Sequence, residues 1–353
     1  MLKKLLYDLT MLNGIPGNER RVRKYFEQAV AGKAAVTFDN LGSVIAEKIG
    51  DSAGPKIMFS GHMDEIGFIV TEITKEGYVK FIPAGGWWGH VVLGQQFQIT
   101  TKADRTVHAV VGSKPPHILS EEERKKVVDL KDMYLDLGVP SRSAVETLGV
   151  AIGDMITPYI ESRELADPKY LLAKAFDNRV GVALAIEVLD NLQGVAHPNV
   201  YYGVGSVQEE VGERGAATAA YKIGPDIGIA LDVTVAHDYS GGSKDTELGK
   251  GPCLMIYDSS MVGHVALREF AISLCEELHI PYQLSYLRQG GTDAGKIHVA
   301  KSGCPSLAVC LACRYLHSHT SIIYEDDYEN AVRLVTAMVQ RLDRATVDAI
   351  TYR

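Results

Sequence analysis

Residues 55–70 read PKIMFSGHMDEIGFIV, and this stretch guides the interpretation of the rest of the chain. The apolar run at residues 57–59 is short and uninterrupted, which predicts a strand buried on both faces, as in a parallel sheet. His62 and Asp64 follow this run directly. Because open α/β sheets bind ligands beyond the carboxyl ends of their strands, the end of this strand is a candidate functional site.

Apolar strands and helices alternate along much of the chain. Residues 33–50 predict a hairpin that turns at residues 40–42. Further strands are expected within residues 199–212, 225–238 and 304–323, and helices at residues 176–194, 260–280 and 325–350. This alternation predicts an α/β sheet covered by helices.

The pattern of residue types changes between residues 68 and 167, where polar and apolar residues alternate and glycine is frequent. That pattern predicts small antiparallel strands, and the charged stretch at residues 120–138 predicts one helix among them. We interpret residues 68–167 as an inserted β-rich domain and residues 1–67 with 168–353 as one α/β domain. A chain of 353 residues also favours two domains.

Composition excludes several classes of function. The formal net charge is -8 and there is no long basic run, so a nucleic-acid partner or an anionic membrane is not expected. No segment approaches about 18 uninterrupted apolar residues, so no membrane-spanning helix is expected. The N-terminal stretch carries Asp8 within its apolar residues, which predicts an amphipathic helix and not a signal peptide.

The five cysteines are odd in number and all fall in the last third of the chain. This distribution disfavours a disulfide framework and favours a reducing compartment, so a cytoplasmic location is expected. Cys310 and Cys313 form a single CxxC in an apolar setting, which predicts buried thiols and not a metal knuckle.

Two acidic residues and a histidine near predicted element boundaries are candidates for metal chemistry. His62 could bind a metal through one ring nitrogen while Asp64 orients the imidazole, although a surface loop with a polar cap is the simpler alternative. Asp177 precedes an apolar helix, where a helix N-cap is the ordinary explanation. Its two carboxylate oxygens could also bridge two metal ions.

Glu209 and Glu210 are adjacent at the end of an apolar strand. Two neighbouring carboxylates repel each other unless a cation or a proton neutralises them, so either a solvated loop or a metal site is expected. One of them could bind a metal while the other acts as a general base. Asp232 ends another apolar strand, where an unpaired buried charge would be costly.

The segment CRYLHSHTS contains His317 and His319, of which only one need be a ligand, while His237 and Asp238 are weaker candidates. The turn GGTDAG at residues 290–295 could let the backbone approach a substrate closely, or it could be a plain turn. The motifs of phosphate loops, nucleophile-elbow serine hydrolases and HExxH metalloproteases are absent.

The segments GHMDEIGFIV, AFDNRVG, QEEVGERGA, ALDVT, GGTDAG and RYLHSH occur in the order and spacing of one family. The chain resembles the M42 aminopeptidases over nearly its whole length. That family includes glutamyl, deblocking and tetrahedral aminopeptidases and proteins once labelled endoglucanase M. The resemblance implies a phosphorylase/hydrolase-like α/β catalytic domain with an inserted small β-barrel-like domain that serves oligomerisation. It also implies a homo-oligomer, a dodecamer, acting on peptides with a free N-terminus.

The resemblance further implies two divalent metal ions per subunit, zinc or cobalt, and a role for each matching residue. One metal is held by His62 and Asp232, the other by Glu210 and His317, and both are bridged by Asp177. Asp64 orients His62, and Glu209 is the general base for a water shared by the metals. His319 is not expected to be a ligand, because the family motif matches His317.

The expected substrate-binding residues are Gly290, Gly291, Thr292 and Met255. Met255 stands where the resemblance leads us to expect an arginine in acid-specific members, and a thioether offers a glutamate side chain no ion pair. Preference for an acidic first residue and preference for a neutral or apolar one therefore both stay open. Two other readings are a glycoside hydrolase that uses Glu209 and Glu210, and an inactive oligomeric scaffold.

Overall fold

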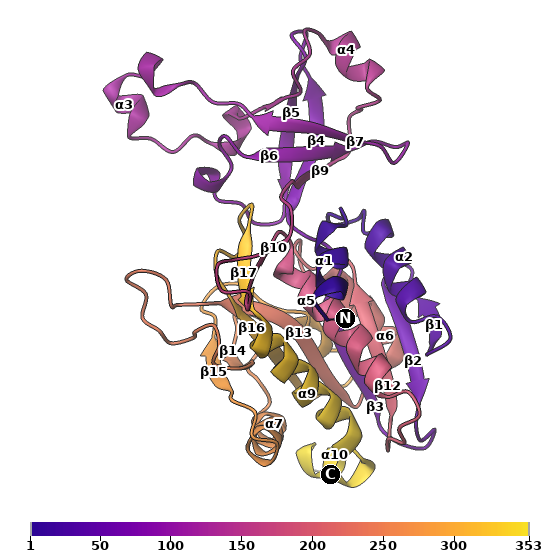
Figure 1. Cartoon of the computed structure of the whole chain (residues 1–353). Helices are drawn as coiled ribbons and strands as arrows, with labels where there is room; N and C mark the ends of the chain where they lie inside the picture. Colours follow the sequence, from indigo (N-terminus) through magenta and orange to yellow (C-terminus); the bar gives the residue numbers. More distant parts are fainter. Residues whose placement is uncertain (1, 352–353) are drawn as a thin grey trace.

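The computed structural model describes residues 2–351, and its centre is an eight-stranded mixed sheet (Figure 1). The strands of this sheet are β1 (Ala35–Phe38), β2 (Val44–Ile49), β3 (Lys56–His62), β12 (Val200–Ser206), β13 (Ile227–Val235), β14 (Cys253–Tyr257), β15 (Gln283–Tyr286) and β16 (Ser306–Cys313). They lie in the order β1-β2-β12-β3-β13-β16-β14-β15. The four central strands β12, β3, β13 and β16 are parallel, so their carboxyl ends meet at one edge.

Helices cover this sheet on both faces. They are α1 (Leu2–Met11), α2 (Arg20–Ala29), α5 (Phe176–Asn191), α6 (Arg214–Ile223), α7 (Val265–Glu277), α8 (Ala294–Ile297), α9 (Glu325–Arg341) and α10 (Arg344–Ile350). The prediction of an α/β sheet with helices is confirmed by this arrangement and by the hairpin of β1 and β2.

The sequence of β3 is apolar without alternation because both faces of this strand are buried. Successive side chains of a strand point to opposite faces. Ile57 and Phe59 pack into the core beneath α5, while Met58 packs into a second cluster beneath α6. Both faces of β3 are therefore shielded from water. Burial of one such side chain contributes about 1.5–3 kcal/mol, which fixes the position of the strand and of the residues at its end.

Six further strands form a closed barrel with its own hydrophobic core. They are β4 (Gly67–Ile73), β5 (Tyr78–Ala84), β6 (Gln96–Thr100), β7 (Thr106–Val111), β8 (Leu135–Asp136) and β9 (Met155–Pro158). They pair in the order β4-β5-β8-β7-β6-β9, with β9 returning to β4. We call residues 67–158 the barrel region; it lies above the carboxyl edge of the large sheet in Figure 1.

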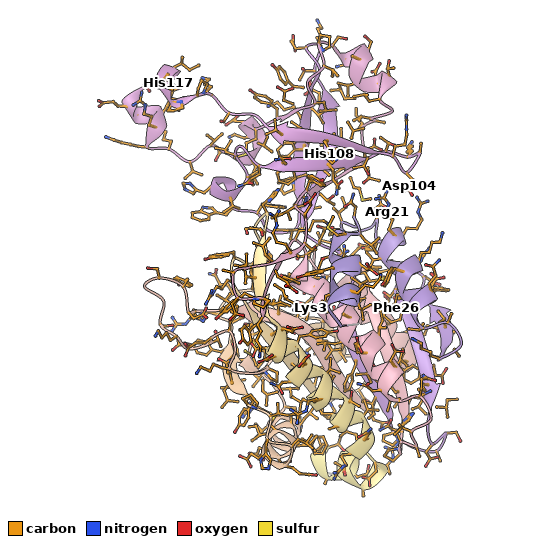
Figure 2. The ribbon with its side chains drawn as sticks, viewed as in Figure 1. Lys3, Arg21, Phe26, Asp104, His108 and His117 are labelled. Carbon is orange, nitrogen blue, oxygen red and sulfur yellow. The ribbon has the colours of Figure 1, made fainter. Side chains whose placement is uncertain are left out.

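The predicted helix at residues 120–138 is wrong. This stretch contains only the single turn α3 (Glu121–Arg124), the 3-10 turn η3 (Leu130–Asp132) and strand β8. Residues 120–129 are all exposed, so no apolar face packs against another element to stabilise a longer helix. A capping box between Ser120 and Glu123 supports one turn and no more. The stretch projects as an arm, with His117 of the turn η2 (Pro116–Ile118) beside it (Figure 2).

An ion pair and a small sheet are among the features that join the barrel region to the rest of the chain. Figure 2 shows Arg21 of α2 facing Asp104 of the β6–β7 turn, and their Nη2 and Oδ1 atoms are 2.7 Å apart. A small sheet of β10 (Arg163–Glu164), β11 (Tyr170–Ala173) and β17 (Ser321–Tyr324) lies where the chain leaves the barrel. Strand β10 therefore pairs outside the barrel, although it falls within the predicted insertion.

The described cysteines are all buried with free thiols, including the CxxC pair on β16. Among residues 2–351, none of the helices combines the length and hydropathy that crossing a bilayer requires.

Candidate metal centre

The carboxyl edge of the central strands brings His62 and Asp232 together. Ser60 of β3 pairs with Ala230 of β13, so the residues two positions further along each strand point to the same face. Asp177 enters this space from the start of α5. Ligand atoms of His62, Asp177 and Asp232 all lie within 4.8 Å of one another, and His62 Nε2 is 3.1 Å from Asp177 Oδ1.

A second group forms on the other side of Asp177. His317, on the loop between β16 and β17, places its Nε2 3.5 Å from Asp177 Oδ2 and 3.6 Å from Glu210 Oε2. These three residues again offer ligand atoms within 4.8 Å of one another. Asp177 thus presents one oxygen to His62 and the other to His317, which is the arrangement of a bridging carboxylate.

The electrostatics of the cluster are unfavourable without a cation. Burial, together with the nearby carboxylate of Asp177, raises the pKa of Glu210 to about 8. Burial likewise raises the pKa of Asp232 and of Glu209 well above the usual values. For His62, burial alone would lower the pKa, but the surrounding carboxylates, Glu209 foremost, outweigh it and raise the pKa.

The donor set fits divalent metal ions. Carboxylate oxygens and imidazole nitrogens are the ligands that zinc and similar ions take in catalytic sites. Glu210 Oε1 is buried, and no residue of the described chain donates a hydrogen bond to it. A buried carboxylate oxygen without a partner is costly, and a bound cation would remove that cost.

Both histidines are held in the tautomer that a metal requires. His62 Nδ1 lies 3.0 Å from the carbonyl oxygen of Asp64, and His317 Nδ1 lies 2.8 Å from the carbonyl oxygen of Gly86. Because a carbonyl can only accept, each Nδ1 carries the hydrogen. In the neutral ring that binds a metal, each Nε2 then carries the lone pair, and both Nε2 atoms face the carboxylates.

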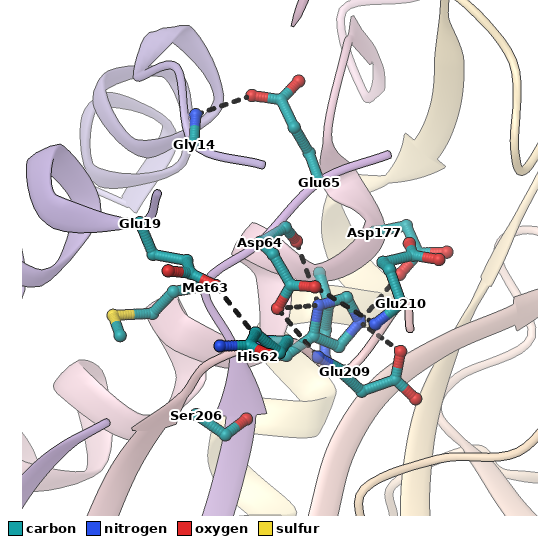
Figure 3. Close-up of polar contacts among 12 residues, drawn as sticks. Gly14, Glu19, His62, Met63, Asp64, Glu65, Asp177, Ser206, Glu209 and Glu210 are labelled. Atoms are coloured by element: carbon teal, nitrogen blue, oxygen red, sulfur yellow. Dashed lines mark hydrogen bonds and ion pairs between the residues drawn. The ribbon is translucent and has the colours of Figure 1, made fainter. Parts of the chain in front are cut away.

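Asp64 contacts His62 less directly than the sequence suggested. Its carboxylate Oδ1 is 3.6 Å from His62 Nδ1, which is too long for a hydrogen bond. The two carboxylate oxygens instead accept hydrogen bonds from the backbone amides of Glu209 and Glu210, each at 3.1 Å (Figure 3). Asp64 therefore fixes the loop that carries both glutamates, while its backbone carbonyl orients His62.

Glu209 lies at the margin of the cluster. Its Oε2 is 3.6 Å from His62 Nε2, and its side chain keeps 11% of its surface exposed. A further group of possible ligands joins His62, Glu209 and Glu210. Glu209 is thus near enough to serve either as a ligand or as a base beside the ligands.

Several expected residues lie elsewhere. Met255 is fully buried in a core cluster with Cys310 of the neighbouring strand, so its side chain faces no open pocket in this structure. Thr292 is also buried, and its hydroxyl donates to Asp258 Oδ2 at 3.2 Å. Gly290, by contrast, is exposed at the tip of its turn, with a φ of +91° that favours glycine, and Gly291 is partly buried beside it.

The weaker histidine candidates are occupied by other contacts. His319 Nε2 lies 2.6 Å from the carbonyl oxygen of Gln96. His237 Nδ1 bonds with Thr246, and Asp238 forms an ion pair with Arg314. None of these candidates belongs to a ligand group among residues 2–351.

The sequence interpretation missed a buried ionic cluster beneath the site. Lys174 Nζ donates to Glu65 Oε2 at 2.7 Å, and Arg179 Nη2 lies 3.3 Å from Glu65 Oε1. Arg179 also donates to the carbonyl of Met63 at 2.9 Å. Lys174 and Arg179 flank Asp177, and Glu65 follows Asp64, so the signal was charge beside the predicted ligands.

Asp293 of the GGTDAG turn was noted in the sequence but given no role. It is buried and accepts hydrogen bonds from Ser60 at 2.6 Å and from Ser206 at 2.5 Å. Ser206 is the last residue of β12, and Ser60 lies on β3 two residues before His62, which ends that strand. Asp293 therefore ties the turn to the edge of the sheet that carries His62.

A two-lobed α/β fold with a His/Asp/Glu cluster at its sheet edge is the architecture of a metal-dependent peptidase. The chain belongs to the M42 aminopeptidases, because residues 42–334 match the family model described as M42 glutamyl aminopeptidase. Members of this family are metal-dependent peptide hydrolases, and the comparison confirms the resemblance seen in the sequence.

The relatives agree over nearly the whole chain. The TET aminopeptidase of the marine sediment archaeon Thaumarchaeota archaeon SCGC AB-539-E09 is 41% identical, with 99% of each chain covered and a TM-score of 0.96. A glutamyl aminopeptidase of Lactococcus lactis subsp. cremoris is 32% identical over 97% of each chain. The Pyrococcus horikoshii TET1 peptidase, described as assembling into a tetrahedron or a large octahedral shell, is 29% identical over 97% of this chain and all of its own, with a TM-score of 0.87.

Proposed function

We propose that this protein is a dinuclear-metal aminopeptidase that removes the N-terminal residue from peptides. The observation that carries the proposal is the placement of Asp177, whose two oxygens face His62 and His317 at 3.1 and 3.5 Å. A site for one metal ion does not need a carboxylate whose two oxygens face two different imidazoles.

Two zinc or cobalt ions fit this set of carboxylate and imidazole ligands. His62 and Asp232 would hold one ion, Glu210 and His317 would hold the other, and Asp177 would bridge them. Such a pair supplies Lewis acidity, which polarises the scissile carbonyl and makes water more acidic. The five ligands come from five separate segments of the chain, so they form a site only in the folded protein.

Glu209 is the proposed general base. It sits beside the ligand cluster, and burial, followed by the neighbouring carboxylates of Glu210 and Asp232, raises its pKa. Glu209 would take the proton of the attacking water and return it to the leaving amine. Asp64 would hold Glu209 in place, because its carboxylate accepts a hydrogen bond from the backbone amide of Glu209.

The substrate is proposed to be a peptide with a free N-terminus, and its first side chain is either acidic or neutral and apolar. The name of the Lactococcus relative supports an acidic residue. The sequence has methionine at position 255, where an acid-specific enzyme would need a cation such as arginine, and the lack of that cation supports a neutral residue. The backbone of Gly290 and Gly291 is proposed to contact the substrate, and the exposure of Gly290 in the turn that carries Asp293 supports this role.

We also propose that residues 68–167 form an oligomerisation domain inserted in a catalytic domain of residues 1–67 and 168–353. The assembly named for the Pyrococcus relative supports a homo-oligomer, a dodecamer in our proposal. Buried free thiols support a reducing, cytoplasmic setting. The glycosidase alternative is not favoured, since both glutamates are tied side by side to one aspartate and cannot flank a glycosidic bond.

The deciding experiment is stepwise return of cobalt, zinc or manganese to chelator-treated protein. Activity is followed with the p-nitroanilides of glutamate, leucine and lysine. The proposal expects loss of activity on chelation and full recovery at two ions per chain. Full activity in the metal-free protein would overturn it, as would an absence of metal binding, which the inactive-scaffold reading predicts.

A further inference from the structure

His317 is the proposed ligand with the least support from its own segment. Its side chain is 45% exposed, whereas that of His62 is 2% exposed. Its φ of +52° lies in the left-handed region, which costs a residue with a Cβ about 1–2 kcal/mol. His62 is held by a carbonyl two residues along its own strand end, but no residue of the loop 314–320 accepts a hydrogen bond from His317 in the described structure.

The barrel region supplies the missing support. The carbonyl of Gly86, just after β5, accepts from His317 Nδ1 at 2.8 Å. The carbonyl of Gln96, on β6, lies 2.6 Å from His319 Nε2, and the ring of Phe97 meets His319 edge-on at 5.6 Å. The loop 314–320, which follows β16 and carries His317, is therefore held by two hydrogen bonds to residues of the barrel region.

Gly86 can approach this closely because it has no side chain. A Cβ built on Gly86 would lie 3.1 Å from His317 Nδ1, closer than carbon and nitrogen atoms normally pack. Gly85, with a φ of +94°, makes the turn that aims the Gly86 carbonyl at the imidazole. The same turn brings Gly85 within 3.4 Å of Glu210 Cβ, measured from an added Cβ.

We propose that Gly86 is a positioning residue for one of the two metal sites, the site of Glu210 and His317, and that His319 is its second anchor. The proposal rests on the proposed dinuclear function. The site of His62 and Asp232 has no such dependence, because the orientation of His62 comes from the backbone of Asp64. The barrel region thus contributes to metal binding at one site and not at the other.

The test is titration of metal-free protein with Co(II), followed by calorimetry and by visible absorption. The wild type is expected to show two binding events, and His317→Ala shows which event belongs to the His317 site. Gly86→Ala is expected to weaken that event about tenfold or more, as loss of outer-shell partners of metal ligands commonly does. The other event is expected to keep its affinity.

Two further variants separate positioning from general destabilisation. His319→Phe keeps a ring against Phe97 but loses the bond to Gln96, and it is expected to weaken the same event. Gly94→Ala strains the barrel at a φ of +74° where an added Cβ meets nothing within 4 Å, and it is expected to change neither event. Unchanged affinities in Gly86→Ala and His319→Phe, or equal weakening of both events, would overturn the inference. Fewer than two Co(II)-binding events in the wild type would instead count against the proposed dinuclear function.

Discussion

The carboxylate of Asp64 accepts a hydrogen bond from the backbone amide of Glu209, with 3.1 Å between Oδ1 and the nitrogen. Its second oxygen accepts the amide of Glu210 at the same distance. One buried aspartate thereby aligns the proposed base and a proposed ligand, while its backbone carbonyl orients His62. Asparagine has one acceptor where aspartate has two, so its amide group would confront one of these N–H groups.

Asp64→Asn is therefore expected to reduce both metal affinity and kcat by about 10- to 100-fold, the range seen for outer-shell partners. Calorimetric titration with Co(II) and steady-state kinetics on one p-nitroanilide would measure this. Asp238→Asn, which alters an aspartate paired with Arg314 outside the cluster, is the control. Wild-type values in Asp64→Asn would show that the loop needs no such anchor.

Glu209→Gln is expected to bind two metal ions but to lose about 10²–10⁴-fold in kcat, because glutamine cannot accept the proton. Metal content and turnover are measured on the same preparation. Glu269→Gln, at an exposed position of α7, is expected to match the wild type. If Glu209→Gln lost a metal ion together with its activity, Glu209 would be a ligand and not the base.

Removal of metal is expected to lower thermal stability. Ions that bind only the folded state stabilise it by about 2.7 kcal/mol per site at 100 times the dissociation constant. In Asp232→Asn the gain on adding metal should fall by about half, since one site loses a ligand. The metal-free form of this variant should be no less stable than the wild type, because burial raises the pKa of Asp232 and already disfavours its charge. Melting curves with and without chelator test both statements.

Glu19 predicts a pH dependence. Burial raises its pKa from 4.5 to about 7, and the charge of Asp64 adds to the effect. Since the folded state holds the proton more tightly, the stabilising contribution is complete below about pH 4.5 and is lost as the pH rises to about 7. Glutamine keeps the acceptor for the amides of Gly17 and Gln208 but cannot ionise.

Glu19→Gln should therefore gain stability over the wild type as the pH rises from about 5 to about 8. Melting temperatures of chelator-treated proteins at the two pH values give the difference. A gap between variant and wild type that does not change with pH would mean that Glu19 ionises normally in the folded protein.

The buried cluster of Glu65, Lys174 and Arg179 is expected to be a large contributor to stability. Glu65→Gln leaves two buried cations without a counter-charge, and loss of one partner of a buried pair costs about 3–5 kcal/mol. Lys169→Ala breaks an exposed pair with Asp326 and should cost far less, because solvent screens that pair. Denaturant unfolding of both variants measures the contrast, and equal losses would show that the cluster is already solvated.

The helix prediction at residues 120–138 failed for a reason that the sequence could not show. Its charged residues suit a helix locally, but a helix of that length needs an apolar face packed on a partner, and this arm has none. Met255 stays a prediction of a substrate-binding residue, and in this structure strand β14 turns its side chain into a core cluster.

The residues that the sequence could place are those at the ends of apolar strands. His62 and Asp232 stand out as candidates because burial on both faces produces a continuous apolar run, and a charged residue that ends such a run is conspicuous. The pair of Glu209 and Glu210 stands out in the same way, but the choice of Glu210 as the ligand needed the family resemblance. Asp177 and His317 needed the family resemblance, since an N-cap and an exposed loop explained them equally well. Gly86 gave no pattern, and Lys174 and Arg179 gave only a charge close to Asp177, because their partners are far away in the chain.

The sequence by itself determined the order of elements, the chemical types at the sheet edge and the membership of a family, since these depend on local hydrophobic periodicity and on short motifs. Only the tertiary structure decided which oxygen of Asp177 faces which histidine and that Asp64 binds two amides. It also decided that a carbonyl of the barrel region orients His317. The physical reason is that hydrogen bonds and metal sites require separations of a few ångströms, and residues distant in the chain reach them only when the whole core packs.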